Sequence, residues 1–102
     1  ICQQELFAPI LTIQPFTTEA DALALANQTD AGLAAYIYGR DERRNFRIAS
    51  QLQAGMVGIN ASAISDVRAP FGGVRASGFG REGSVYGLAE YQQIKHLCWQ
   101  FD

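Results

Sequence analysis

Hydrophobic and polar residues follow one another in blocks along the chain, and these blocks predict an α/β arrangement. Residues 6–16 are apolar and β-branched but contain two prolines, which predicts an extended segment with Pro9 at a bend or a sheet edge. Apolar and small residues then recur at helical spacing after Thr18, whose hydroxyl can cap a helix that should end before residues 30–32. Residues 33–38 are apolar and aromatic, which predicts a short buried strand.

The same helix–strand alternation occurs a second time. Asp41 can cap a helix that carries its arginines outward, and Gly55 is placed to end that helix in a left-handed conformation. Residues 56–60 form another short apolar run, which predicts a second strand. Two alternations of this kind favour an α/β layer in which parallel strands are flanked by helices.

The last forty residues have a different character. Residues 61–83 are rich in glycine and show neither the helical nor the strand periodicity of apolar residues. They therefore predict a loop, and a loop of this length is typical of a functional segment. Residues 86–94 predict a short helix, and residues 94–101 predict a strand with more apolar surface than a free tail should expose.

Composition narrows the range of functions. A chain of 102 residues that is 48% hydrophobic and 18% charged is typical of one small globular domain. The net charge is −2 with acids and bases interspersed, so neither nucleic acid nor an anionic membrane is an expected partner. No apolar run approaches the roughly 18 residues of a membrane span. The start at Ile1 is interpreted as a cut inside a longer protein, and a cytoplasmic location is expected.

The titratable residues offer no catalytic group. Cys2 and Cys98 match no metal spacing; two thiols in a reducing cytoplasm are favoured, and a disulfide between them is the alternative. Cys2 has no visible base or cation beside it, and Cys98 lies in an alternating apolar segment where a thiol behaves as a small hydrophobe. His96 has no neighbour in the sequence that it could activate. We therefore predict no catalytic residue and no metal site in this chain.

Two patterns resemble ligand sites but favour simpler interpretations. The segment Gly78-Phe79-Gly80-Arg81-Glu82-Gly83 satisfies G-x-G-x-x-G, yet no strand precedes it, so a nucleotide site here is a minor alternative. Four arginines cluster at the second predicted helix: Arg40, Arg43, Arg44 and Arg47. Three of them fall on the exposed side of that helix with Asp41 and Glu42 beside them, which favours a solvated helix face over a phosphate site.

Two other segments carry groups suited to binding. Glu5 and Phe7 are two residues apart in extended chain and so point the same way; the carboxylate can accept hydrogen bonds from a ribose diol beside an apolar ring. An ordinary edge strand is the alternative. Ser65 and Phe71 place a hydroxyl and a ring on a loop beyond a strand end, where α/β proteins bind ligands.

Together the motifs resemble those of the aldehyde dehydrogenase superfamily over essentially the whole chain. Residues 5–9 resemble its E-x-F-G-P motif with Ala8 in place of glycine, and residues 27–35 resemble N-x-T-x-x-G-L-A-A. Residues 55–60 resemble G-x-V-x-I-N, and residues 70–83 resemble P-F-G-G-x-K-x-S-G-x-G-R-E-G. Ile64-Ser65 before the last block is similar to the succinate-semialdehyde members in particular.

The resemblance implies a fold and roles for four residues. Residues 1–93 would be the C-terminal portion of the catalytic domain, and residues 94–102 a terminal oligomerisation strand. Glu5 would hold the nicotinamide ribose of NAD or NADP, and Phe7 would pack near the nicotinamide ring. Phe71 would line the aldehyde tunnel, and Ser65 would bind the substrate's distal carboxylate with arginines outside this chain.

The resemblance also implies what the chain lacks. The family's nucleophilic cysteine, general-base glutamate, oxyanion asparagine and dinucleotide-binding domain would lie before Ile1, so the isolated chain is expected to be inactive. The parent would be a homo-oligomer that oxidises succinate semialdehyde or a similar small aldehyde with NAD or NADP. The alternative is a non-catalytic module that self-associates or docks a partner through the apolar edge Leu97 to Phe101.

Overall fold

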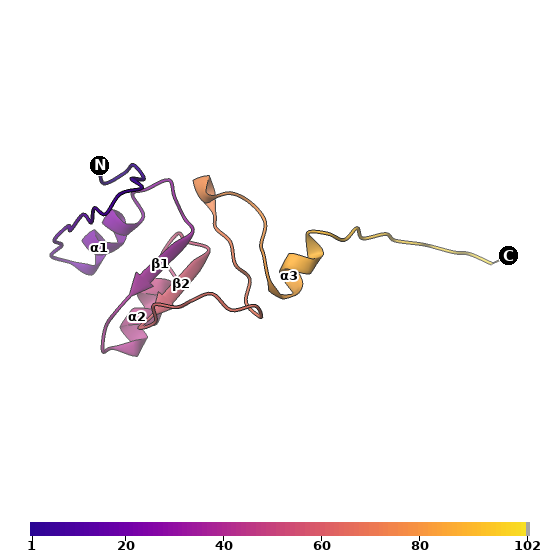
Figure 1. Cartoon of the computed structure of the whole chain (residues 1–102). Coiled ribbons are helices and arrows are strands. Elements are labelled where there is room, and N and C mark those ends of the chain that lie inside the picture. Colours follow the sequence, from indigo (N-terminus) through magenta and orange to yellow (C-terminus); the bar gives the residue numbers. More distant parts are fainter. Residues whose placement is uncertain (102) are drawn as a thin grey trace.

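The computed structural model describes residues 1–101. It is elongated, with extents of 71 × 33 × 23 Å, and its C-terminal segment extends away from the remainder (Figure 1). The elements in chain order are α1 (Glu19–Ala26), β1 (Ala34–Ile37), α2 (Glu42–Ala49), β2 (Met56–Ile59), a 3₁₀ turn η1 (Arg75–Ser77) and α3 (Ser84–Ala89).

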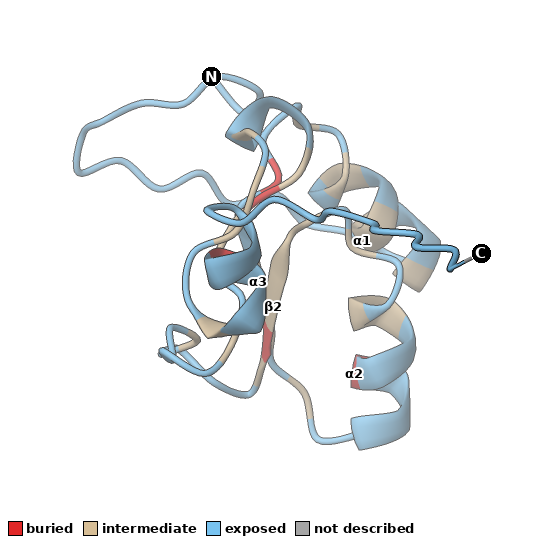
Figure 2. Cartoon of the chain, turned by 90° about the vertical axis from the view of Figure 1, so that its right-hand side faces the viewer, coloured by how far each residue is buried: buried red, intermediate tan, exposed pale blue. Residues whose placement is uncertain are grey.

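The two strands form a small parallel sheet, as the helix–strand alternation predicts. β1 and β2 are in register from the pair Ala34–Met56 to the pair Ile37–Ile59. Parallel neighbours need a crossover, which α2 supplies, and α2 packs against β2. Figure 2 shows α1 and α2 on one side of β2 and α3 on the other.

Both predicted helix caps are confirmed. Thr18 and Asp21 form a capping box: the Thr18 hydroxyl accepts from the Asp21 amide at 3.1 Å, and the Asp21 carboxylate accepts from the Thr18 amide at 3.0 Å. Asp41 accepts a hydrogen bond from the Arg44 amide at 3.0 Å. The sequence therefore marks the starts of α1 and α2 correctly.

The predicted end of the second helix at Gly55 is wrong, because α2 stops at Ala49. The side chain of Asn27 holds the following turn: its amide donates to the Gln51 carbonyl at 3.0 Å and its oxygen accepts from the Gln53 amide at 2.8 Å. Gly55 instead allows two segments of backbone to pass close together, because a Cβ on residue 55 would lie 2.0 Å from the Gly72 carbonyl oxygen.

The prediction that residues 33–38 form a buried strand is also wrong in this chain. No hydrophobic side chain among residues 1–101 is buried, and β1 alternates exposed with half-buried positions. Each strand has a single neighbour, and the short helices cover too little of the sheet to enclose its side chains. Asn45 is the one buried polar residue of the described chain, with 3% of its surface exposed.

The end regions depart from the predicted elements. α3 spans Ser84–Ala89 rather than 86–94, and residues 94–101 form no strand. A strand requires a partner ladder, and nothing within residues 1–101 provides one for this segment. Residues 6–16, in contrast, are extended and bend at Ala8 and Pro9, as predicted, and the Ala8 amide donates to the Leu6 carbonyl at 2.9 Å. No helix in the described part of the chain is long and apolar enough to cross a membrane.

Candidate functional site

The glycine-rich loop, residues 71–83, closes on itself. Phe71 and Glu82 exchange two backbone hydrogen bonds of 2.8 and 2.7 Å in an isolated antiparallel bridge. Inside this closure, the Arg81 Nη1 group donates to the carbonyls of Gly73 and Gly80, each at 2.7 Å. The loop is therefore a bonded unit rather than an open stretch of chain.

This loop is fastened to the connector, residues 27–33, which joins α1 to β1. The Val74 amide donates to the Gly32 carbonyl at 3.0 Å, and the Ala76 amide donates to the Asp30 carbonyl at 3.0 Å. In return the Gly32 amide donates to Ser77 Oγ at 2.8 Å in a partly buried contact. The Gly32 carbonyl also accepts from the Gly55 amide at 2.9 Å, so the connector links the loop to the start of β2.

An open concavity of about 720 Å³ lies between the loop and α3. Its wall combines apolar side chains with charged ones, which is the lining expected of a surface that contacts either a ligand or another part of a protein. Phe71 lines it and is 36% exposed. Its other large side chains are Leu33, Phe79, Arg81, Glu82, Leu88, Glu90 and Tyr91.

The four predicted binding residues come from two separate segments. Glu5 and Phe7 lie in the N-terminal segment; both are exposed, Phe7 by 96%. Ser65 is exposed and precedes a turn in which the Ala69 amide donates to the Asp66 carbonyl at 2.9 Å. None of these three residues lines the concavity that contains Phe71. Within residues 1–101, the four predicted binding residues therefore lie on separate surfaces and do not line one common pocket.

The residue after Ser65 carries a paired charge. The Asp66 carboxylate accepts from Arg68 Nε at 2.9 Å and from Arg68 Nη2 at 2.7 Å. The side-chain hydrogen bond from Arg68 lowers the pKa of the Asp66 carboxyl below its ordinary value. The pair leaves the turn beside Ser65 without net charge.

The glycines from Gly78 to Gly83 do not form a dinucleotide fingerprint. The turn η1 precedes them where the fingerprint needs a strand, and the helix that follows is only six residues long. Gly78, Gly80 and Gly83 have φ values of 101°, 80° and 66°, which a side chain would strain. The glycines therefore shape the loop.

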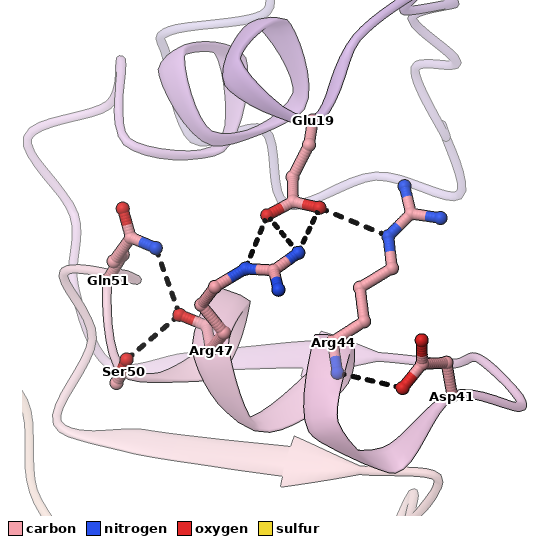
Figure 3. Close-up of polar contacts among 6 residues, drawn as sticks. All are labelled: Glu19, Asp41, Arg44, Arg47, Ser50 and Gln51. Carbon is pink, nitrogen blue, oxygen red and sulfur yellow. Dashed lines mark hydrogen bonds and ion pairs between the residues drawn. The ribbon is translucent and has the colours of Figure 1, made fainter.

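The arginines of α2 are exposed, as predicted, and two of them also bind Glu19 at the start of α1. Arg47 donates to both Glu19 carboxylate oxygens at 2.8–3.0 Å, and Arg44 Nε donates to Glu19 Oε2 at 3.1 Å (Figure 3). The hydrogen bond from Arg47 is the main cause of a lowered pKa at Glu19. These guanidinium groups tie α2 to α1 across the gap between the helices, which helical spacing alone does not reveal.

Three asparagines were not singled out from the sequence, although two lie inside its recognised motifs. Asn27 clamps residues 51–53 as described above. Asn60 Oδ1 accepts from the Gly39 amide and Asn60 Nδ2 donates to the Gly39 carbonyl, both at 2.9 Å. Buried Asn45 donates to the same carbonyl at 2.9 Å. The motif asparagines therefore hold the ends of the sheet and its connections.

The remaining titratable residues form no further site. Cys2 and Cys98 are free and exposed. Residues 1–101 contain no group of three His, Cys, Asp or Glu side chains that could hold a metal ion.

Comparison with known proteins identifies a family. The model of the aldehyde dehydrogenase family matches residues 1–97. The chain is 51% identical to glutarate-semialdehyde dehydrogenase of Pseudomonas aeruginosa over 96% of its length, and 50% identical to the NADP(+) succinate-semialdehyde dehydrogenase of Escherichia coli over 96%. It spans 20% of each relative's length. The NAD+ complex of Staphylococcus aureus betaine aldehyde dehydrogenase superposes with a TM-score of 0.84 at 40% identity, covering 87% of this chain and 18% of that one.

Proposed function

Because the chain belongs to the aldehyde dehydrogenase family, we propose that it is the C-terminal part of an NAD(P)-dependent semialdehyde dehydrogenase. In this proposal the complete enzyme oxidises succinate semialdehyde or a similar acidic aldehyde to the carboxylic acid. The chain supplies walls for the cofactor and the substrate, and the nucleophile comes from the rest of the enzyme. The high identity to a glutarate- and a succinate-semialdehyde dehydrogenase carries this proposal.

The exposed apolar surface supports a role as part of a larger body. Large hydrophobic side chains are exposed on the N-terminal segment, on the helices and on the concavity, and none is buried within residues 1–101. Apolar surface of this extent favours contact with further protein. In the proposed enzyme, the remaining catalytic-domain segments cover these faces.

The N-terminal segment fits the nicotinamide end of the cofactor. Glu5 accepts no hydrogen bond from any residue between 1 and 101, so its exposed carboxylate is available to both hydroxyls of a ribose diol. The uncovered ring of Phe7 offers an apolar surface to the nicotinamide. Bound NAD(P)+ supplies the hydride acceptor, while Glu5 and Phe7 orient it.

The segment of residues 61–83, which carries both Ser65 and Phe71, fits an aldehyde that has a second, acidic end. The exposed Ser65 hydroxyl can donate to a distal carboxylate, and Phe71 gives the tunnel an apolar side. Because Arg68 neutralises Asp66, the turn next to Ser65 does not repel that carboxylate. Residues 94–101 act in the same proposal as the strand that joins neighbouring subunits of a cytoplasmic homo-oligomer.

Steady-state kinetics of the complete dehydrogenase test these roles. Ser65→Ala should raise KM for succinate semialdehyde about tenfold or more, because a lost hydrogen bond to a charged group is worth roughly 1.5–3 kcal/mol. It should leave KM for butanal, which has no carboxylate, unchanged. Ser62→Ala, which removes another exposed hydroxyl three residues before Ser65, is the matched control. Equal effects on both aldehydes would contradict the role of Ser65, and a wild-type preference for butanal would contradict the substrate class.

A non-catalytic docking module is the second candidate function. Residues 94–101 favour it, because Ile94, Leu97, Trp99 and Phe101 are all exposed and the last two rings stack at 5.5 Å. Light scattering of the 102-residue chain and of a variant ending at Gln93 separates the candidates. Defined dimers or higher oligomers of the longer chain alone would support the module, whereas monomers of both would contradict it.

A further inference from the structure

Arg75 has an unusual backbone for its residue type. Its φ is 59°, a left-handed conformation in which a Cβ crowds the neighbouring carbonyl, so that glycine would be the preferred residue. Its side chain is 34% exposed, so the neighbouring segments cover most of it. A strained non-glycine residue persists where its surroundings over-determine it, and such residues cluster near functional sites.

The guanidinium group of Arg75 reaches the C-terminal end of α1. Nη1 donates to the Asn27 carbonyl at 3.2 Å, and Nη2 lies 3.6 Å from Asp30 Oδ1. Carbonyls at this end of a helix lack intrahelical donors and carry the negative end of the helix dipole, so a cation is favoured there. Arg75 therefore bonds the loop to a fixed point, because the Asn27 side chain is itself held by residues 51–53.

Ser77 completes the attachment from the other end of the same turn. Its Oγ accepts from the Gly32 amide at 2.8 Å, and the Val74 and Ala76 amides donate to the connector on either side of Arg75. Four successive residues, 74–77, thus each contact residues 27–32. We name residues 74–77 the strap.

The position of the strap is transmitted to Phe71 through close glycine packing. A Cβ on Gly73 would lie 2.6 Å from Ser77 Cβ, and a Cβ on Gly72 would lie 2.6 Å from the Gly80 carbonyl oxygen. A side chain would therefore not fit at either glycine, because the backbone between Phe71 and the strap packs closely on Ser77 and Gly80. Tightly packed atoms transmit a displacement instead of absorbing it, so movement of the strap moves Phe71.

We propose that Arg75 and Ser77 are positioning residues for the aldehyde wall. They hold the loop against the connector and thereby fix the place of Phe71 without touching the substrate themselves. The inference rests on the proposed function, in which Phe71 lines the aldehyde tunnel. It predicts that the strap governs the binding of the aldehyde and not that of the cofactor, whose predicted contacts Glu5 and Phe7 lie in another segment.

The kinetic test uses the complete dehydrogenase. Arg75→Ala and Ser77→Ala should each raise KM for the aldehyde by about tenfold, within the roughly 100-fold that a displacement of 1 Å in a site can cause. KM for NAD(P)+ should stay at the wild-type value. Arg75→Lys should restore KM for the aldehyde, because an ammonium can donate to the same carbonyl. A fall in kcat with both KM values unchanged would overturn the inference.

Arg75→Gly separates the side-chain tie from the backbone strain. Glycine accepts the positive φ but cannot bond Asn27, so this variant should bind the aldehyde as weakly as Arg75→Ala. Wild-type KM in Arg75→Gly would overturn a role for the guanidinium group.

Hydrogen exchange measured by mass spectrometry provides a readout that does not depend on activity. Amides of residues 71–83 should exchange faster in Arg75→Ala than in the wild type, and unchanged exchange would overturn the strap. A wild-type enzyme that oxidises no aldehyde would overturn the proposed function instead, while the exchange experiment would still decide whether the strap holds the loop.

Discussion

Separating this chain from any covering protein should leave it without a cooperative fold. Its accessible surface is 8949 Å². A compact folded protein of 11.1 kDa exposes about 5,700 Å² by the usual scaling with mass. Its radius of gyration, 18.5 Å, likewise exceeds the roughly 13 Å of a compact domain of this length.

The excess surface decides the outcome. The chain exposes about 3,300 Å² more surface than a compact protein of the same mass. A little over half of this excess is apolar, so the missing burial corresponds to roughly 45 kcal/mol at about 25 cal/mol per Å². The extended terminal segments account for much of this area. Even a quarter of the total, about 11 kcal/mol, equals the whole net stability of an ordinary domain, which is roughly 5–15 kcal/mol.

Urea unfolding of residues 1–102 followed by far-UV circular dichroism and Trp99 fluorescence tests this prediction. We expect a shallow, non-cooperative change and strong binding of an apolar dye in the absence of urea, because the strand and helix faces are uncovered. The complete dehydrogenase is the control and should bind little dye. A sharp transition of a monomeric 102-residue chain, with both probes coincident, would refute the reasoning.

Two further predictions concern the complete enzyme, and a third concerns the isolated chain. A Cβ at residue 55 would lie 2.0 Å from the Gly72 carbonyl oxygen, so Gly55→Ala must push that carbonyl away to an ordinary contact distance. The heat-inactivation midpoint should therefore fall by several degrees, whereas Ala54→Gly should change it little. Equal shifts of the midpoint in the two variants would contradict this packing. Glu19 has a lowered folded pKa, so its ion pairs stabilise the fold above the ordinary value of 4.5 and are lost as pH falls through the folded value. Glu19→Gln should therefore lower the midpoint at pH 7, and this difference should shrink as the pH falls below 4.5; a difference independent of pH would contradict this. The isolated chain should not oxidise succinate semialdehyde, and turnover above background would contradict that expectation.

Local signals in the sequence predicted the elements whose cause is local. Thr18 and Asp41 cap the two helices because a short polar side chain reaches amides only two or three residues ahead. The alternation of helix and strand predicted a parallel pair, because a crossover of this length leaves few other arrangements. Motifs spread over the whole chain also predicted the family, which the match to residues 1–97 confirms.

Features that depend on distant partners were predicted poorly. Asn27, more than twenty residues earlier, holds the turn that follows α2, and Glu19 on another helix pairs with two of the arginines. Burial of β1 and formation of a strand at 94–101 failed for the same reason, since each needs neighbours that residues 1–101 do not supply. The roles of Glu5, Phe7, Ser65 and Phe71 stay predictions.

The sequence by itself determined the starts of α1 and α2 and the parallel strands, since these follow from residue type and spacing over short distances, and it determined the family through motifs that each occupy a short segment. Only the tertiary structure decided why particular motif residues are needed. The Asn27 clamp, the contact of Gly55 with Gly72 and the strap at residues 74–77 all join segments that are remote along the chain. Their geometry arises when the backbone brings those segments together, and no local pattern encodes the distances involved.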